Sequence, residues 1–484
     1  MKLQNKQLLQ TQAYIAGQWV SADDGATMAV MNPSTGEEVV TVASCGAVET
    51  RRAIEAANAA LPAWRGKTAK ERANLLRRWF ELMMENQRDL ALIIAHEQGK
   101  SFNEALGEIA YAANYIEWFA EEAKRIYGDI IAPPSNDKRL MVIRQPVGVV
   151  ASITPWNYPS AMITRKVAPA LAAGCTFVAK PAAETPLSAF AMVALAEQAG
   201  FPAGVFNVVC GKDSRAIGGE ITANPIVRKL SFTGSTEVGK MLIAQCAETV
   251  KKVSMELGGN APFIVFDDAD IEAAVTGAMA SKYRNSGQTC VCANRIMVQE
   301  NVYDEFAARL AEEVRKFRLG DAADENTTMG PLINAREAIK VQSMVDDALA
   351  LGARALAGGE RSTKGECFVE PTVLVDASED MRVFNEEIFG PVAPLFRFKT
   401  EDEAVAMANN TPFGLASYFY TRDMGRIWRV SEALEYGMVG INEGIISNEM
   451  APFGGIKESG SGREGSKYGI DDYVEMKYLC MAGL

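Results

Sequence analysis

Residues 148–257 decide the fold, because five short apolar runs in this stretch alternate with helical patterns. The runs are Gly148–Trp156 (GVVASITPW), Thr176–Pro181 (TFVAKP), Gly204–Gly211 (GVFNVVCG), Lys229–Gly234 (KLSFTG) and Lys252–Leu257 (KVSMEL). Strands that are apolar along their whole length and separated by helices are typical of a parallel sheet with helices on both faces. Ligands of such sheets bind beyond the carboxyl ends of the strands. We therefore predict an α/β fold with a ligand site where TPWN, AKPA, FTGS and MELGG come together.

The segments on either side of this stretch extend the same architecture. Apolar residues at helical spacing predict helices over 49–60, 69–98 and 102–125. A second strand–helix run, from PFIVF (262–266) to NEGIISNEMAPFGG (442–455), predicts a second α/β unit of similar size. Residues 127–146 predict two strands joined by a Pro/Ser/Asn/Asp turn, and IDDYVEMKYLCMAG (470–483) predicts a terminal edge strand suited to pairing with another subunit.

Composition narrows the class of protein. The chain has 484 residues, of which 48% are hydrophobic and 23% charged, values typical of a folded globular protein. A net charge of -12 argues against a nucleic-acid partner, because phosphate backbones require clustered Lys and Arg. The N-terminus lacks the pattern of a signal peptide and no apolar run reaches membrane length, so we expect a cytoplasmic location without membrane contact.

The small number of potential metal-binding side chains further limits the catalytic chemistry that we expect. The chain has one histidine, His96, in an ordinary helical pattern, and its eight cysteines show no zinc-binding spacing. We therefore expect no metal and no histidine-based catalytic triad.

Three polar residues near strand ends point to acyl chemistry. Cys290 follows a polar, glycine-containing turn in NSGQTCVCANR (285–295), Glu256 ends an apolar run, and Asn157 ends another. An exposed thiol, a carboxylate base and an amide donor for an oxyanion are the groups that such chemistry needs. Cys290 alone would be weak evidence, because most cysteines are packed thiols.

Five segments of the sequence resemble the signature segments of a known superfamily. They are FTGSTEVGK (232–240), MELGGN (255–260), GQTCVCANR (287–295), EEIFGPV (386–392) and PFGGIKESGSGREG (452–465). In this order they resemble the signature segments of the aldehyde dehydrogenase superfamily, over essentially the whole chain. Residues 154–175, 281–295 and 442–455 are most similar to the bacterial, NADP-preferring succinate-semialdehyde dehydrogenases.

The resemblance implies a division of the chain. A Rossmann-like parallel-sheet domain for the dinucleotide would comprise residues 1–126 and 146–255, and a second α/β domain for catalysis residues 256–458. A small β segment for oligomerisation would comprise residues 127–145 and 459–484. The implied assembly is a homodimer or a homotetramer.

The resemblance also implies the catalytic roles. Cys290 would attack the aldehyde, Asn157 and the Cys290 backbone N–H would hold the oxyanion, and Glu256 would activate the water that releases the acid. Hydride would leave the thiohemiacetal for the cofactor before the thioester is hydrolysed. Cys292 is a candidate redox partner for Cys290, although a packed thiol is the simpler interpretation.

The implied cofactor contacts are Trp156, Lys180, Ala183, Gly234, Ser235, Leu257, Glu387 and Phe389. Many members of the superfamily carry Glu where this chain has Ala183, and that carboxylate accepts the ribose hydroxyls of NAD. Its absence favours NADP, whereas the neighbouring Glu184 keeps NAD possible.

The implied substrate carries a carboxylate remote from its aldehyde. Arg165, Arg284 and Ser447 fall where succinate-semialdehyde dehydrogenases hold that carboxylate, and guanidinium groups bind carboxylates with forked donors. The expected reaction is therefore oxidation of succinate semialdehyde to succinate, as in 4-aminobutyrate degradation. Glutarate semialdehyde or another ω-carboxy aldehyde is the alternative.

Three other functions fit the sequence less well. Residues 234–240 match the phosphate loop GxxxxGK, but Met241 stands where that loop needs Ser or Thr for magnesium. A catalytically inactive relative would be expected to lack Cys290 or Glu256. A dehydrogenase that transfers the acyl group to coenzyme A would generally lack a carboxylate at position 256.

Overall fold

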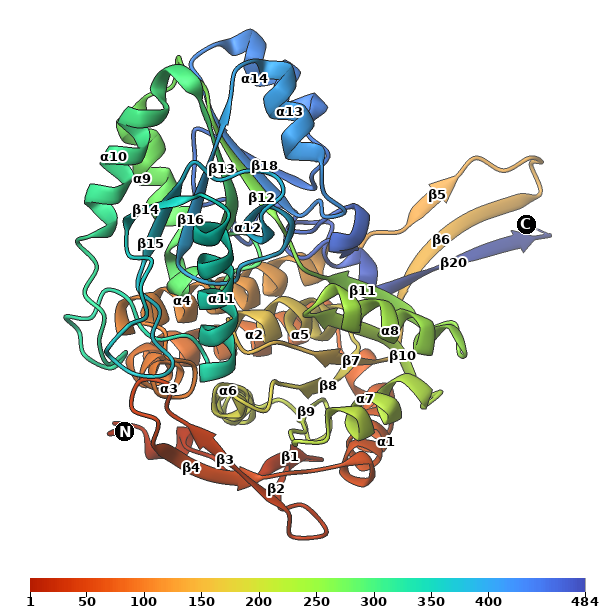
Figure 1. The fold of residues 1–484 in the computed structure, drawn as a ribbon. Helices are drawn as coiled ribbons and strands as arrows, with labels where there is room; N and C mark the ends of the chain where they lie inside the picture. Colours follow the sequence, from red (N-terminus) through yellow and green to blue (C-terminus); the bar gives the residue numbers. More distant parts are fainter. Residues whose placement is uncertain (484) are drawn as a thin grey trace.

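The computed structural model describes residues 1–483, and two large sheets organise it (Figure 1). The first sheet has eight strands, in the spatial order β19 (Gly460–Ser461), β11 (Lys252–Glu256), β10 (Val227–Thr233), β7 (Val149–Ile153), β8 (Thr176–Lys180), β9 (Phe206–Val208), β1 (Ala13–Ile15) and β2 (Gln18–Val20). The five strands from β11 to β9 are parallel, which confirms the parallel sheet expected from residues 148–257. Their carboxyl ends share one edge, and Asn157 and Glu256 lie there.

Helices cover both faces of this sheet. One face packs against α1 (Ala47–Arg65), α7 (Ser214–Ala223) and α8 (Thr236–Ala247), and the other against α2 (Ala69–Glu85), α3 (Gln87–Gln98), α4 (Phe102–Glu122), α5 (Ala161–Ala173) and α6 (Pro186–Gln198). Successive strand residues point to opposite faces, so Phe177 of β8 joins one apolar core and Val178 the other. This two-sided burial is typical of a parallel sheet covered by helices.

The helix expected over 69–98 is divided in two. Asn86 separates α2 from α3, and its side-chain Nδ2 donates to the Leu82 carbonyl oxygen at 2.8 Å. An asparagine side chain that binds nearby backbone competes with the helical hydrogen bonds, which is why the helix ends there.

The second sheet has seven strands, in the order β14 (Arg354–Ala357), β15 (Thr372–Val375), β16 (Val392–Phe398), β13 (Ala293–Gln299), β12 (Ala261–Val265), β17 (Ala416–Tyr420) and β18 (Met438–Ile441). Its two faces are covered by α9 (Ile271–Lys282) and α10 (Tyr303–Val314) on one side, and by α11 (Ala335–Ala350), α12 (Arg382–Asn385), α13 (Glu401–Asn409) and α14 (Met424–Ala433) on the other. The second α/β unit is therefore present as predicted.

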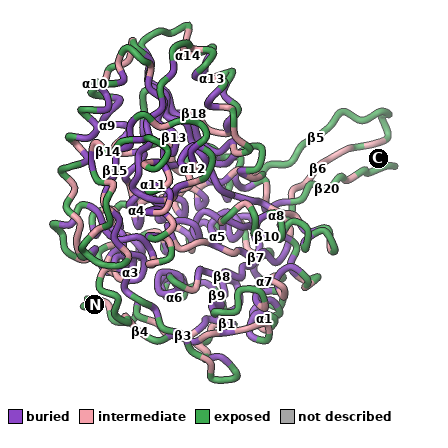
Figure 2. Tube along the Cα trace, in the orientation of Figure 1, coloured by how far each residue is buried: buried purple, intermediate pink, exposed green. Residues whose placement is uncertain are grey.

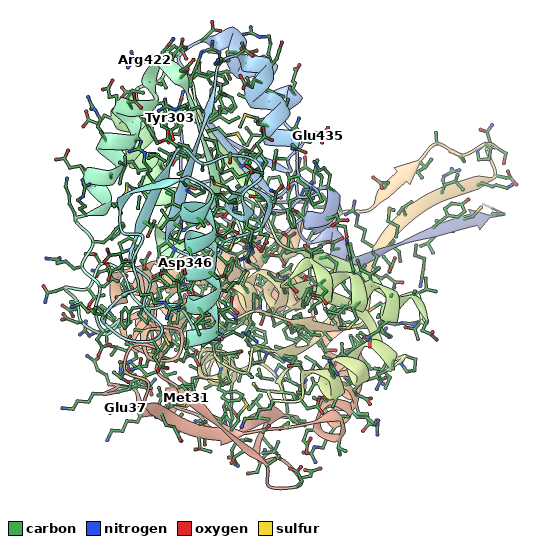
Figure 3. All side chains as sticks on the ribbon, viewed as in Figure 1. Met31, Glu37, Tyr303, Asp346, Arg422 and Glu435 are labelled. Atoms are coloured by element: carbon green, nitrogen blue, oxygen red, sulfur yellow. The ribbon has the colours of Figure 1, made fainter. Side chains whose placement is uncertain are left out.

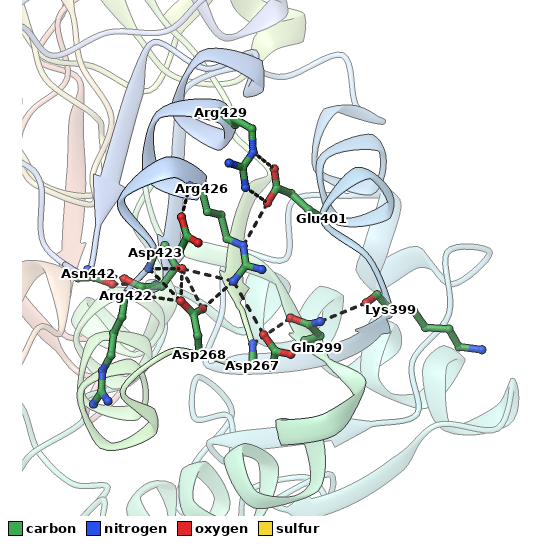
Figure 4. A network of polar contacts seen from close by, with 11 residues as sticks. Asp267, Asp268, Gln299, Lys399, Glu401, Arg422, Asp423, Arg426, Arg429 and Asn442 are labelled. Atoms are coloured by element: carbon green, nitrogen blue, oxygen red, sulfur yellow. Dashed lines mark hydrogen bonds and ion pairs between the residues drawn. The ribbon is translucent and has the colours of Figure 1, made fainter.

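A polar network closes the far end of this second unit (Figure 4). Asp268, just after β12, accepts hydrogen bonds from the backbone N–H groups of Arg422 and Asp423, both at 2.9 Å, and from Arg426 at 2.7 Å. These bonds tie the segment after β12 to α14 and to the turn that precedes it. Figure 3 shows Arg422 at this end of the molecule and Met31 and Glu37 at the opposite end, where β3 (Thr27–Met31) and β4 (Glu38–Ala43) form a separate two-stranded sheet.

A three-stranded arm projects from the body, and most of it is exposed (Figures 1 and 2). The hairpin of β5 (Asp129–Ile131) and β6 (Lys138–Pro146) and the terminal strand β20 (Val474–Ala482) form it, as the sequence predicts. Residues 459–473 lie elsewhere than in the arm, since β19 pairs with β11 and Ile470 and Tyr473 are buried in the first core. Within residues 1–483, no helix is both long enough and apolar enough to cross a membrane.

Candidate active site

A rigid turn places Cys290 just before β13. Asn285 and Ser286 adopt left-handed conformations, with φ of 52° and 55°, which non-glycine residues keep only when the surroundings hold them. The Asn285 backbone N–H donates to Glu104 at 2.7 Å, and the Ser286 hydroxyl donates to the Gly330 carbonyl at 2.8 Å. A side chain on Gly287 would meet the Gly390 carbonyl oxygen at 2.1 Å, so only glycine fits there. The turn therefore has a defined shape that fixes the position of the cysteine.

Cys290 lies where two cavities meet. One, of about 260 Å³, is lined by Lys100, Glu104, Gly107, Glu108, Tyr111, Tyr158, Met162, Arg165, Arg284, Thr289, Cys290, Val291, Ser447 and Phe453. The other, of about 200 Å³, is lined by Pro155, Trp156, Asn157, Met162, Thr233, Gly234, Ser235, Leu257, Gly258, Cys290, Glu337, Lys340, Glu387 and Phe389. Only Cys290 and Met162 line both, so the thiol can react with a group in one cavity while facing a second molecule in the other.

Asn157 is held against the turn that carries the cysteine. Its side-chain Nδ2 donates to the Gln288 carbonyl at 3.0 Å, and its own carbonyl accepts from Lys100 and Asn285. An amide nitrogen carries two hydrogens, so one N–H of Asn157 remains for a ligand in the cavity that it lines. This position suits a donor to an oxyanion.

Burial raises the pKa of both Glu256 and Cys290. Both carboxyl oxygens of Glu256 are buried without a hydrogen-bond partner among residues 1–483. Burial and the Glu464 charge raise the pKa of this carboxyl well above its ordinary value. Burial also raises the pKa of the Cys290 thiol to about 12, against a lowering effect of Arg165. Glu256 lines neither of the two cavities at Cys290.

The three residues predicted to bind a substrate carboxylate line the same cavity as Cys290. Arg165 and Arg284 are both buried there, together with Ser447. Arg165 forms a 2.6 Å ion pair with Glu464, a residue to which the sequence assigned no role. Arg284 has no ion pair within residues 1–483, whereas the buried Nε of each of the two arginines has no hydrogen-bond partner there. The two arginines therefore differ, and Arg284 carries the charge that remains uncompensated.

Carboxylates also line this cavity, but each is engaged by other groups. Glu108 pairs with the buried Lys100, and Glu104 accepts from Asn285 and Ser101. No motif in the sequence marks Lys100, which lies just before α4, or Glu104 and Glu108 of α4.

Six of the eight predicted cofactor residues line the second cavity: Trp156, Gly234, Ser235, Leu257, Glu387 and Phe389. The rings of Trp156 and Phe389 meet edge to face at 5.6 Å. Ser235 caps the start of α8, where backbone N–H groups favour an anion. A side chain on Gly239 would collide with Leu257, so glycine lets α8 approach it.

The other two predicted residues lie at the carboxyl end of β8, outside the lining of this cavity: Lys180 is buried and Ala183 half-buried. Burial raises the pKa of Glu387 to about 7. Glu337 and Lys340 of α11 also line the cavity and carry no motif that would have identified them.

Cys292 is buried, with its sulfur 3.6 Å from the Lys282 carbonyl oxygen. Its redox role remains a prediction. Among residues 1–483, no group of three or more His, Cys, Asp or Glu side chains is arranged to hold a metal ion.

Comparison with known proteins agrees with this geometry. Residues 19–479 match the model of the aldehyde dehydrogenase family, and the chain belongs to that family of oxidoreductases. It is 64% identical to a glutarate-semialdehyde dehydrogenase of Pseudomonas putida over the full length of both chains. It is 61% identical to an NADP(+) succinate-semialdehyde dehydrogenase of Escherichia coli, over 99% of this chain and 100% of the relative. It is 60% identical to a 3-sulfolactaldehyde dehydrogenase of Pseudomonas putida, over 100% of this chain and 99% of the relative.

Solved structures agree as well. The crystal structure of a succinate-semialdehyde dehydrogenase from Burkholderia pseudomallei has a TM-score of 0.98 at 62% identity, with both chains fully covered. This similarity confirms the α/β fold and the resemblance stated from the sequence.

Proposed function

We propose that the protein oxidises an aldehyde with a carboxylate at its far end to the dicarboxylic acid, with succinate semialdehyde as the main substrate. The observation that carries this proposal is the unpaired Arg284 guanidinium in the cavity that also exposes Cys290. A buried cation without a partner is costly, and a substrate carboxylate would compensate it. The names of three relatives support this choice, because glutarate semialdehyde, succinate semialdehyde and 3-sulfolactaldehyde all carry an anionic group.

The residues act in sequence. The Cys290 sulfur, after losing its proton, bonds to the aldehyde carbon, and the oxygen becomes an alkoxide that the Asn157 amide and the Cys290 backbone N–H hold. When bound, the dinucleotide supplies a hydride acceptor. Loss of hydride leaves a thioester, which water attacks while Glu256 takes a proton from that water. The carboxylic acid leaves and the Cys290 thiolate is restored.

The second cavity supports a dinucleotide beside Cys290, since it combines an aromatic pair, a helix start and the Glu387 carboxyl. We assign NADP as the preferred acceptor, because Ala183 leaves no carboxylate to repel a 2′-phosphate at that position. The exposed Glu184 leaves NAD as a second acceptor. The NADP(+) in the name of the Escherichia coli relative supports this order.

The proposal also includes the division of the chain into domains and its assembly. We assign residues 1–126 and 146–255 to dinucleotide binding, residues 256–458 to catalysis, and the arm to assembly into a homodimer or homotetramer in the cytoplasm. Because residues 459–473 pack on the first sheet, we assign only β20 of the terminal segment to the arm.

One assay tests the function. The purified protein is given succinate semialdehyde, glutarate semialdehyde or butanal, each with NADP and with NAD and without coenzyme A. We expect free acid, and a kcat/KM for both semialdehydes about 10- to 150-fold above that for butanal, as loss of a charge-assisted contact costs ~1.5–3 kcal/mol. Equal values for butanal would contradict the proposal. A higher value for the five-carbon substrate would favour glutarate semialdehyde, the alternative supported by the 64% identical relative.

A further inference from the structure

A third cavity lies away from the aldehyde site, where the arm joins the body. Its volume is about 660 Å³, and it shares no lining residue with the two cavities at Cys290. The end of α1, the start of α2, the ends of α4 and α5, and the bases of β6 and β20 enclose it. The lining residues are Pro62, Arg65, Gly66, Ala69, Arg72, Ala123, Lys124, Ile126, Arg144, Gln145, Pro146, Ala173 and Lys477.

The charged side chains that line this cavity all carry a positive charge. Five of the lining residues are cations, Arg65, Arg72, Lys124, Arg144 and Lys477, and none is a carboxylate. Within residues 1–483, four of the five form no ion pair; Arg144 alone does, with Asp471. Gathering unpaired cations is unfavourable by itself, and it is conspicuous in a chain with a net charge of -12.

Two guanidinium groups have donors left over. Arg72 is 8% exposed, and it donates through Nε to the Ala172 carbonyl at 3.0 Å and through Nη1 to the Lys67 carbonyl. These bonds fix the group and leave its Nη2 without a hydrogen bond to residues 1–483. The Nε of Arg144 is buried and also has no partner there. Buried donors are normally satisfied, and the Arg144 Nε departs from this rule.

We propose that this cavity binds a small polyanion that carries two or more phosphoryl groups. Guanidinium forks match phosphoryl oxygens, and the volume is that of a small-molecule site. No aromatic side chain lines the cavity to stack on a nucleobase, so the phosphoryl groups themselves are the recognised feature. The ligand bridges the body and the arm, since its contacts come from α1 and α2 on one side and from β6 and β20 on the other.

The test uses sodium tripolyphosphate as the probe, measured by isothermal titration calorimetry at constant ionic strength. Saturating NADP is present, so that the second cavity at Cys290 is filled. We expect saturable binding of one probe per subunit. The site variant is Arg65→Gln/Lys124→Gln/Lys477→Gln, which changes three exposed side chains and leaves the buried Arg72 in place. It should bind the probe at least about tenfold more weakly, because three charged contacts are removed.

The matched control is Arg318→Gln/Lys364→Gln/Lys399→Gln, which removes one Arg and two Lys that are also exposed but lie outside the cavity. It should bind the probe like the parent. Equal weakening of both variants would overturn the proposal, since net charge alone would explain the binding. Absence of saturable binding by the parent would also overturn it. If sedimentation then showed that the site variant alone changes its assembly, the cavity would be a contact with another copy of the chain.

Discussion

Glu256, the proposed base, is a buried carboxyl whose pKa lies above its ordinary value. Its pKa is raised by burial and by Glu464, so the carboxylate, and with it deacylation, should increase as pH rises. The raised pKa also means that the neutral carboxyl favours the folded state at low pH, and that this contribution is lost as pH rises through the folded-state pKa.

Glu256→Gln tests this role. We expect a burst of reduced cofactor in the first turnover, because hydride transfer precedes deacylation, and then a steady rate that no longer rises with pH. Stopped-flow absorbance at several pH values measures both phases. The exposed Glu432→Gln on α14 is the control and should keep the parent profile. A variant without a burst would mean that Glu256 acts before hydride transfer.

The two arginines of the substrate cavity should respond differently to substitution. Arg284→Ala should lower kcat/KM for succinate semialdehyde about 10- to 150-fold and leave butanal nearly unchanged, because the loss of one charge-assisted contact costs ~1.5–3 kcal/mol. Arg165→Ala should lower both, since it frees the buried Glu464 charge beside Glu256. Steady-state kinetics with succinate semialdehyde and butanal measures these changes for both variants. Equal losses for Arg284→Ala would show that this residue maintains structure and does not select the substrate.

Ala183 should control the choice of dinucleotide. Ala183→Glu should shift the ratio of kcat/KM for NADP to that for NAD toward NAD, because the new carboxylate repels a 2′-phosphate. Ala183→Gln is the control of equal size without charge and should shift the ratio much less. If the two variants gave the same ratio, discrimination would lie elsewhere in the site.

At the scale of elements, α4 supports the catalytic segments through one carboxylate. Glu108 accepts from the backbone N–H groups of Ser160 and Ala161, at 2.9 and 3.3 Å, and thereby caps the start of α5. It also pairs with the buried Lys100, whose ammonium lies 3.5 Å from the centre of the Tyr158 ring. One side chain thus links α4, α5 and the Asn157 segment.

Glu108→Ala should therefore be strongly destabilising. It leaves the Lys100 charge buried and unpaired, a change that typically costs ~3–5 kcal/mol. Glu117→Ala on the same helix is the control, because its pair with Arg77 is partly exposed and should contribute only ~0–1 kcal/mol. Urea denaturation followed by circular dichroism compares the two. Similar midpoints for both variants would contradict the role assigned to Glu108.

At the scale of the whole molecule, the arm carries exposed apolar side chains. Ile130 of β5 is 85% exposed, and Met476 and Tyr478 of β20 are 75% and 59% exposed. Exposed apolar patches of this kind mark interaction sites, and β20 leaves one edge free. The arm is thus suited to contact a second copy of the chain.

Ile130→Glu/Met476→Glu should convert the oligomer to a smaller species, which sedimentation velocity measures. The new charges would be buried without partners in the interface. Leu351→Glu, an exposed apolar residue on the body, is the control and should leave the assembly intact. An unchanged sedimentation coefficient for the arm variant would show that the arm does not contribute to the interface.

The sequence by itself determined the order of the strands along the chain, the parallel sheet and the arm, and it predicted Cys290, Asn157 and Glu256 as the catalytic residues. These features depend on local patterns: apolar runs, helical spacing and polar residues at strand ends. The prediction that Arg165, Arg284 and Ser447 bind the substrate came from the resemblance to a known family. The fold brings these three residues into one cavity.

Only the tertiary structure decided the pairing of Arg165 with Glu464, the raised pKa values of Glu256 and Cys290, and the cationic cavity at the base of the arm. Each depends on burial or on charges that are far apart in the chain. Contacts between residues far apart in the chain produce no periodic pattern in the sequence. Burial changes the energy of a charge only after the surrounding segments have packed.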